Sequence, residues 1–411
     1  MNSNIKFEYY PVVNQSIIKD SINTIVANKD NWDAPFFIDT KTYLNIDKIQ
    51  KTVDQYLTDR LKNIIVLGTG GSIQTLLALK HLAQRKIFPV TSSRSVELKG
   101  CLDKTSPENS IVIPISRGGE TLDINSTIGV FLKKEYKFLG LSSMGTMYNI
   151  LKKLDYPILD VPDLSGRYAG SVTNVGIVPA YMAGIDVKEF LKGLDQSYQI
   201  FSKYEHQSAI EFASYLFSLY KKGYRVVFSM PYSKNIEGSV GLWVQAISES
   251  TGKDNKGMMG TYQPAPVCQH STLEFLLGGT KGIVIPVLWT VSNEKPGIIL
   301  NSSIDYIDGK GAQNIVNYQA NATFQALIQE RIPAAQISIQ DPTEINIGYT
   351  IAFILSSVYY LCLLFNVNWA ANPKVIIGKK ICNEALLKNI SPEQGENIRK
   401  EIAKEKFKNF Y

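Results

Sequence analysis

Short apolar runs alternate with helix-length segments along most of the chain. Four of these runs, NIIVLG, SIVIPI, KFLGLSS and YPILDVP, fall within residues 63–162. Two more, RVVFSM at 225–230 and GIVIPVLW at 282–289, lie between further helical stretches. Strands that alternate with helices are typical of a parallel sheet covered by helices. The pattern therefore predicts an α/β fold with two α/β units, divided near residues 195–205.

The segments outside these units differ in character. The first forty residues mix polar and aromatic types, and we expect them to lie as an arm over the body. No Pro-rich or Gly/Ser-rich linker separates the two α/β units, so we expect them to pack together with a cleft between them. The predicted parts are an N-terminal arm at 1–40, a first α/β domain at 41–200, a second at 201–345, and a C-terminal helical segment at 346–411.

One apolar run, Gly348–Phe365, is long enough to span a bilayer. Ser356 and Ser357 interrupt it, no basic cluster flanks it, and the chain has one such run. These features favour a buried helix. A membrane anchor is the alternative, and a need for detergent during extraction would distinguish it.

Composition narrows the class of protein. A length of 411 residues suggests about two to three domains. A hydrophobic content of 45% with 19% charged residues excludes disordered and collagen-like chains. The net charge of +6 is too dilute to indicate a nucleic-acid surface and points only weakly towards anionic ligands.

The cysteines indicate a reducing compartment. The chain has four cysteines, which lie far apart in the sequence and form no CxxC pair. None of them lies at metal-ligand spacing from a histidine. Buried free thiols are therefore expected, and a metal site is not. The N-terminus, MNSNIKFEYYPVV, lacks the sequence features of a secretory signal. Together these features predict a cytoplasmic protein.

A glycine loop, Gly68-Thr69-Gly70-Gly71-Ser72, follows the strand NIIVL and precedes a helix. Free N–H groups at the positive end of a helix can hold an anion, and Ser72 is placed to cap the helix. The dinucleotide motif needs Gly or Ala where Ile73 stands, and a Walker loop needs Gly-Lys-Ser/Thr. An anion site and a purely structural turn both remain open for this loop.

A second loop, Ser116-Arg117-Gly118-Gly119-Glu120-Thr121, follows the strand SIVIPI. Two hydroxyl groups, one guanidinium and two glycines suit a phosphate monoester. The carboxylate of Glu120 would repel a phosphate, so we expect it to point away or to contact sugar hydroxyls.

A helix that begins near Gly238 carries Gln245 and Glu249, four residues apart and therefore on one face. Gly252 is placed to end this helix. The partial negative charge of a helix C-terminus favours the protonated form of a carboxyl group, which suits Glu249 to work as a general base. A solvated glutamate at a helix end is the alternative.

Three further residues are candidates for chemistry. His270, one of three histidines, follows the Pro-rich stretch TYQPAPVCQ, and loops of this kind often display functional side chains. Arg167, in Ser-Gly-Arg-Tyr, follows a strand end and can reach a cleft where α/β folds bind ligands. Lys379 lies in NPKVIIGKK. Surface roles are the alternative for Arg167 and Lys379.

Taken in order, these segments resemble the glucose-6-phosphate isomerase family. The likeness runs from about residue 60 to residue 380 and is strongest in WVQAISESTGKDNKG, in the following QHS and in NPKVIIGKK. The resemblance implies two sugar-isomerase (SIS) domains, each an α/β/α sandwich with a parallel-rich sheet, and no cofactor.

The resemblance also implies interconversion of glucose 6-phosphate and fructose 6-phosphate, through ring opening and a cis-enediolate. Glu249 would be the base that moves a proton between C2 and C1, and Arg167 would stabilise the enediolate. His270, with Lys379, would open the ring. The implied substrate-binding residues are Gly70, Gly71 and Ser72 at the sugar end, Ser116, Arg117, Gly118 and Thr121 at the phosphate, and Gln245 beside the base.

By the same analogy the protein is a homodimer with its active sites near the subunit interface, and the helix at 348–365 is expected to contribute to that interface. Its ligand is a small sugar phosphate rather than nucleic acid or a membrane.

The chain departs from the family pattern in places. Gly118 and Glu120 stand where hydroxyl residues are usual, so the loop is closer to the SxSGET form of other sugar-isomerase domains. Cys268 replaces an Asp or Gly, and Asn372 stands where Gln is common. Two alternatives therefore stay open: an isomerase that also accepts another phosphosugar, such as mannose 6-phosphate, and a non-catalytic sugar-phosphate sensor.

Overall fold

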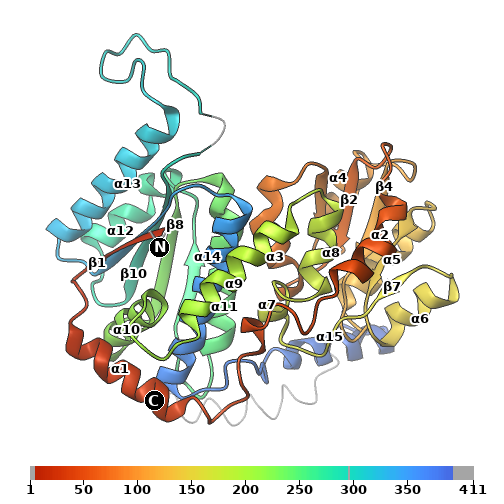
Figure 1. The fold of residues 1–411 in the computed structure, drawn as a ribbon, viewed down its shortest axis with the longest axis horizontal. Helices are drawn as coiled ribbons and strands as arrows, with labels where there is room; N and C mark the ends of the chain where they lie inside the picture. The colour runs from red at the N-terminus through yellow and green to blue at the C-terminus, as the bar shows by residue number, and fades with distance from the viewer. Residues whose placement is uncertain (1–4, 295–296, 392–411) are drawn as a thin grey trace. The chain divides into compact units, whose positions relative to one another are not determined.

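The computed structural model describes residues 5–294 and 297–391. The chain forms two compact units, one up to Trp369 and one from Ala370 onward. The larger unit contains two main sheets, both mostly parallel and both flanked by helices (Figure 1). The predicted α/β class with parallel-rich sheets is confirmed.

The first sheet has the strand order β3-β2-β4-β5, and all its pairs are parallel. Its centre is formed by β2 and β4, whose residues are all buried because helices cover both faces of the sheet. A short parallel pair, β6 and β7, continues beyond it. The bounds are β2 Asn63–Leu67, β3 Lys86–Val90, β4 Ser110–Pro114, β5 Lys137–Phe138, β6 Gly140–Leu141 and β7 Ile158–Leu159.

The second sheet has the order β1-β11-β10-β8-β9. Its pairs are parallel except at one edge, where β1 runs antiparallel to β11 with Ile5 opposite Ile339. The start of the predicted arm is thus a sheet strand. The bounds are β1 Ile5–Tyr10, β8 Val226–Pro231, β9 Met259–Tyr262, β10 Val284–Val291 and β11 Ala334–Ile339.

Helices α3, α7, α9, α11 and α14 occupy the space between the two sheets (Figure 1). The crossing of α3 and α11 is especially close, since a Cβ atom on Gly238 would lie 2.1 Å from the carbonyl oxygen of Leu77. The helices of the larger unit are α1 Gln15–Asn28, α2 Ile46–Val53, α3 Gly71–Leu79, α4 Ser95–Leu102, α5 Leu122–Leu132, α6 Gly145–Lys153, α7 Gly166–Ala169, α8 Asn174–Met182, α9 Val187–Phe201, α10 Ser208–Lys221, α11 Glu237–Thr251, α12 Thr272–Gly278, α13 Ala312–Gln329 and α14 Glu344–Phe365.

Helix α14 contains the long apolar run. It is the one helix among residues 5–294 and 297–391 that is long and apolar enough to cross a membrane, and 94% of its apolar stretch is buried inside the protein. It packs against α9, α10 and α11 of the same chain. The predicted buried helix is confirmed. The expectation that it contributes to a subunit interface is wrong, because elements of its own chain already cover it.

The smaller unit contains α15, Ile376–Lys388. Lys379 lies in its first turn, and the side chain is exposed. Asn372 lies in the segment that precedes this helix.

Candidate active site

The candidate base lies in the last turn of α11, as predicted. The side chain of Glu249 is 22% exposed. Gln245, one turn earlier, donates from Nε2 to Glu249 Oε2 at 3.1 Å, so the two residues share a face. Gly252 ends the helix, and its N–H donates to the carbonyl of Ser248. The carboxylate is therefore held at a helix terminus and remains open to solvent on one side.

Arg167 is the cation beside this carboxylate. Its side chain is fully buried, and Nη1 lies 3.3 Å from Glu249 Oε1. Nε donates to Ser250 Oγ at 2.7 Å, and Nη2 donates to the carbonyl oxygen of Trp369 at 2.6 Å. A buried guanidinium stays charged and needs such partners. The positive charge is thereby fixed in position beside Glu249.

The first glycine loop packs directly on Arg167. A Cβ atom on Gly71 would lie 2.3 Å from the backbone nitrogen of Arg167, so a side chain cannot fit there. Gly70 has φ of +58°, a conformation that favours glycine, and it borders the amide of Gln245. The expected cap by Ser72 is wrong: Gly70 is the N-cap of α3, and Ser72 Oγ instead donates to the carbonyl of Thr69 at 2.7 Å.

The second loop is compact and pre-formed. Ser116 Oγ lies 2.9 Å from Thr121 Oγ1, which draws the two ends of the loop together. Gly119 has φ of +68°, and a Cβ atom there would lie 2.1 Å from the carbonyl oxygen of Met144. Gly118 is exposed, and a Cβ atom there would have no neighbour within 4 Å.

The two charged residues of this loop point in different directions. Glu120 accepts from the backbone N–H of Thr146 at 2.6 Å and from its hydroxyl at 2.8 Å, at the start of α6. A carboxylate at a helix N-terminus is favourable, so Glu120 links the second loop to α6. Its side chain points away from the second loop, which is one of the two orientations expected from the sequence. Arg117 Nε pairs with Asp163 Oδ1 at 3.0 Å, and Nη1 donates to the carbonyl of Leu164.

The segment Asp163–Arg167 joins these parts. Its first residues contact Arg117 of the second loop, its backbone at 166–167 packs on Gly71 of the first loop, and Arg167 reaches Glu249 on α11. Three motifs that are far apart in the sequence therefore meet around this short segment.

Two further candidate residues, His270 and Lys379, lie on other elements of the structure. His270 ends the short 3-10 helix Val267–His270, with an exposed side chain. Lys379 belongs to the smaller unit. Their roles stay predictions.

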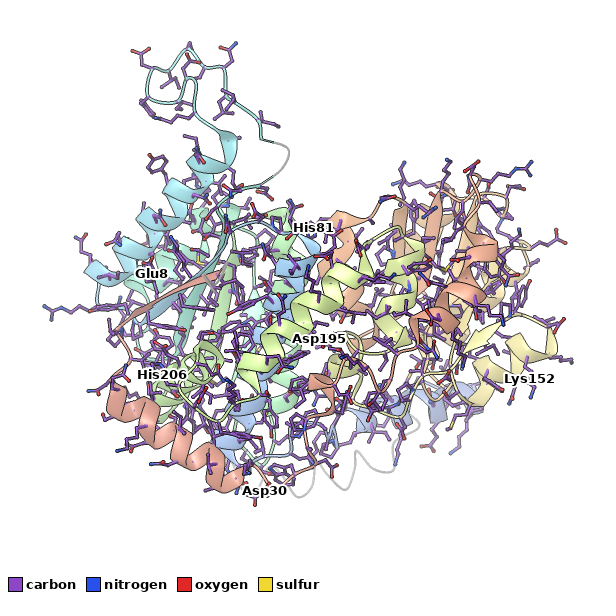
Figure 2. All side chains as sticks on the ribbon, viewed as in Figure 1. Glu8, Asp30, His81, Lys152, Asp195 and His206 are labelled. Carbon is purple, nitrogen blue, oxygen red and sulfur yellow. The ribbon has the colours of Figure 1, made fainter. Side chains whose placement is uncertain are left out.

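The other two histidines have different surroundings (Figure 2). His206 is exposed and lies 3.2 Å from a carboxylate oxygen of Glu211. His81 is half-buried, its Nε2 lies 2.6 Å from the carbonyl oxygen of Pro342, and burial lowers its pKa. His81 is therefore partly enclosed by the protein, whereas His206 is open to solvent.

Sequence reasoning missed two partners of Arg167. Ser250 directly follows Glu249, and Trp369 contributes only its backbone carbonyl. The position of Ser250 next to the candidate base in the sequence could have indicated its role. A backbone carbonyl gives no such indication, because every residue has one.

A groove of about 800 Å³ runs along α3 and α11 and reaches Gln245. Lys80, His81 and Lys234 line its far end. Among the described residues, no group of three or more His, Cys, Asp or Glu side chains gathers as a metal site would require.

Several known proteins are similar to this chain over most of its length. The chain is 24% identical to a glucose-6-phosphate isomerase of Campylobacter jejuni, over 95% of this chain and 99% of that protein. It is also 24% identical to the glucose-6-phosphate isomerase of Methanocaldococcus jannaschii, over 82% and 86% of the two chains. No protein-family model matches the chain.

Solved structures show the same fold. A glucose-6-phosphate isomerase from Chlamydia trachomatis superposes with a TM-score of 0.78 at 16% identity, over 99% of this chain and 92% of that one. A hypothetical protein, TT0462, from Thermus thermophilus superposes with a TM-score of 0.79 at 17% identity, over 90% and 95%. The chain is therefore related, over most of its length, to the glucose-6-phosphate isomerase family.

Proposed function

We propose that this protein interconverts glucose 6-phosphate and fructose 6-phosphate. Relatives that carry this name match nearly the whole chain. The observation that carries the proposal is the ion pair between Arg167 and Glu249, in which a fully buried cation lies 3.3 Å from a partly exposed carboxylate. Aldose–ketose isomerisation needs this combination of a base and a fixed positive charge.

In the proposed reaction Glu249 takes the proton from C2 of the open-chain aldose. The electrons of the broken C2–H bond form the C1–C2 double bond, and the carbonyl oxygen becomes an enediolate oxygen. Arg167 stabilises the negative charge that develops there, because its guanidinium is already in place and needs no reorganisation. Glu249 then returns its proton to C1 while the hydroxyl proton on O2 passes to O1, so no atom is gained or lost.

The two loops are proposed to bind the rest of the substrate. Gly70, Gly71 and Ser72 would line the sugar end, near the amide of Gln245. The phosphate would be held by Ser116, Arg117, Gly118 and Thr121. Binding energy from the phosphate, which does not react, can be used to position the sugar carbons.

Ring opening is proposed to use His270 and Lys379. Opening a pyranose requires a proton to be given to the ring oxygen and another to be removed from the anomeric hydroxyl. An imidazole and an amine are suited to these transfers. This part of the proposal rests on the resemblance of the QHS and NPKVIIGKK segments alone.

A coupled assay that supplies fructose 6-phosphate and detects glucose 6-phosphate tests the proposal. Glu249→Gln keeps the shape of the side chain and removes the base, so kcat should fall by roughly 10²-fold to 10⁴-fold or more while substrate binding is largely retained. An unchanged kcat would remove Glu249 from the mechanism.

A different phosphosugar substrate is the alternative, because Gly118 and Glu120 replace the usual hydroxyl residues in the second loop. A panel that includes mannose 6-phosphate in the same assay decides this point. A folded protein that binds sugar phosphate and turns over no member of the panel would instead be the non-catalytic sensor.

We further propose a cytoplasmic location and a homodimer. The wide spacing of the four cysteines supports the first proposal. The second follows from the family resemblance alone.

A further inference from the structure

The end of α11 carries two residues of the proposed site side by side. Glu249 provides the carboxylate, and the hydroxyl of Ser250 accepts a hydrogen bond from Arg167. The last four carbonyl groups of any helix lack partners within the helix. The backbone that presents Glu249 and Ser250 is therefore a part of α11 that needs donors from outside.

Lys253, two residues beyond the helix end, supplies such donors. Its Nζ donates to the carbonyl oxygen of Glu249 at 3.0 Å and also to that of Ser250. The lysine is half-buried. It thus binds the backbone of the same two residues whose side chains meet Arg167.

We propose that Lys253 is a positioning residue for the isomerase reaction: its ammonium group fixes the last turn of α11 and so holds the Glu249 carboxylate and the Ser250 hydroxyl in register with Arg167. Its positive charge also offsets the partial negative charge of the helix end, which would otherwise repel the carboxylate. This inference rests on the proposed function. Lys253 acts through Glu249 and Ser250 rather than on the substrate.

The surroundings make this cation sensitive to pH. Burial is the main cause that lowers the pKa of Lys253 to about 8, and Arg167 of α7 lowers it further. Glu249, Asp254 and Cys362 of α14 act in the opposite direction. Burial raises the pKa of the Cys362 thiol to about 12, so this thiol does not change its charge near pH 8.

The charge state of Lys253 sets the direction of the pH effect. Below about pH 8 the ammonium form is present and the helix end is held. As the pH rises through about 8, the lysine loses its charge, and kcat should fall. An arginine at this position would keep its charge and its donors across this range.

The test is steady-state kinetics with fructose 6-phosphate from about pH 6.5 to 10, on the wild type, Lys253→Met and Lys253→Arg. Lys256→Met is the matched control, because Lys256 Nζ also donates to a helix-end carbonyl, that of Phe365 at 3.0 Å, away from Glu249. We expect Lys253→Met to lower kcat about 10-fold to 100-fold with KM changed less than about threefold, the effect of a misplaced catalytic group.

Lys253→Arg should retain most of the activity, and the decline of kcat near pH 8 should move up by more than about one pH unit. Lys256→Met should match the wild type. Full kcat in Lys253→Met, or an unmoved alkaline decline in Lys253→Arg, would overturn the proposal. If Lys253→Met does not fold by circular dichroism, the comparison of wild type with Lys253→Arg decides alone.

A measurement without turnover separates this inference from the proposed function. In a wild-type protein with ¹³C-labelled lysines, the signal that Lys253→Arg removes should titrate near pH 8. A titration near the ordinary value of about 10.4 would overturn the inference even in an active isomerase. Absence of isomerase activity in the wild type, by contrast, would contradict the proposed function.

Discussion

Under the proposed function, Arg167 is a buried cation whose partners already hold it in place before a substrate binds. Its guanidinium donates to Ser250 and to the Trp369 carbonyl and faces Glu249, so its partners hold it from several sides. A charge in a water-poor site acts strongly on a developing oxyanion. In the proposed reaction, Arg167 would therefore stabilise the transition state without having to reorient.

Arg117 is predicted to contribute chiefly to binding. If its side chain leaves Asp163 for the substrate phosphate, it acts alike on substrate and transition state. Arg117→Ala should then raise KM roughly 10-fold to 100-fold, because a hydrogen bond to a charged group contributes about 1.5–3 kcal/mol. Steady-state kinetics with fructose 6-phosphate measure this effect.

Asp163→Asn is the matched control, since it keeps Arg117 and weakens only its present ion pair at 3.0 Å. This variant should not raise KM. A loss in Arg117→Ala that falls on kcat, with KM unchanged, would assign Arg117 a role other than phosphate binding.

The sequence predicts local parts of the site and misses distant ones, for a physical reason. Gln245 and Glu249 are four residues apart on a helix, so helical geometry alone brings them together. Arg167 meets Ser250 across 83 residues and Trp369 across 202. Contacts of that range depend on how whole elements pack, which no local pattern records.

At the scale of elements, the contact between the first glycine loop and α7 tolerates no side chain. Gly71→Ala would place a methyl group 2.3 Å from the backbone nitrogen of Arg167. Backbone must move to relieve such overlap, so the free energy of unfolding should fall by about 1–3 kcal/mol, and activity should fall with it. Urea unfolding monitored by circular dichroism measures the change.

Gly129→Ala provides the control at a glycine that has open space around it. Gly129 lies inside α5, and a Cβ atom there would have no neighbour within 4 Å. Alanine should therefore stabilise this helix by about 0.5–1 kcal/mol. Equal stabilities of the two variants would contradict the close packing at Gly71.

The strands show the same division between local and distant information. The apolar runs that predict β2, β4, β8 and β10 are long and rich in β-branched residues. The runs that form β3 and β11, KIFPV and AAQISI, were not predicted. AAQISI begins with two alanines, which are weak strand formers. These two strands are set by their neighbours in the sheets.

At the scale of the whole molecule, the proposed homodimer must use surfaces other than α14. Exposed apolar side chains are available around the edge strand β9, among them Met259, Tyr262 and Val267. Light scattering after size-exclusion chromatography should give twice the mass of one chain at micromolar concentration. A single-chain mass would remove the proposed dimer.

The segment Asp163–Arg167 is fixed at both ends, by Arg117 on one side and by Gly71 and Glu249 on the other. Under the proposed function, its length sets the spacing between the phosphate and the reacting carbons. A substrate with a longer or shorter carbon chain would need a different number of residues here. The choice of sugar would then depend on backbone length as well as on the side chains that touch the ligand.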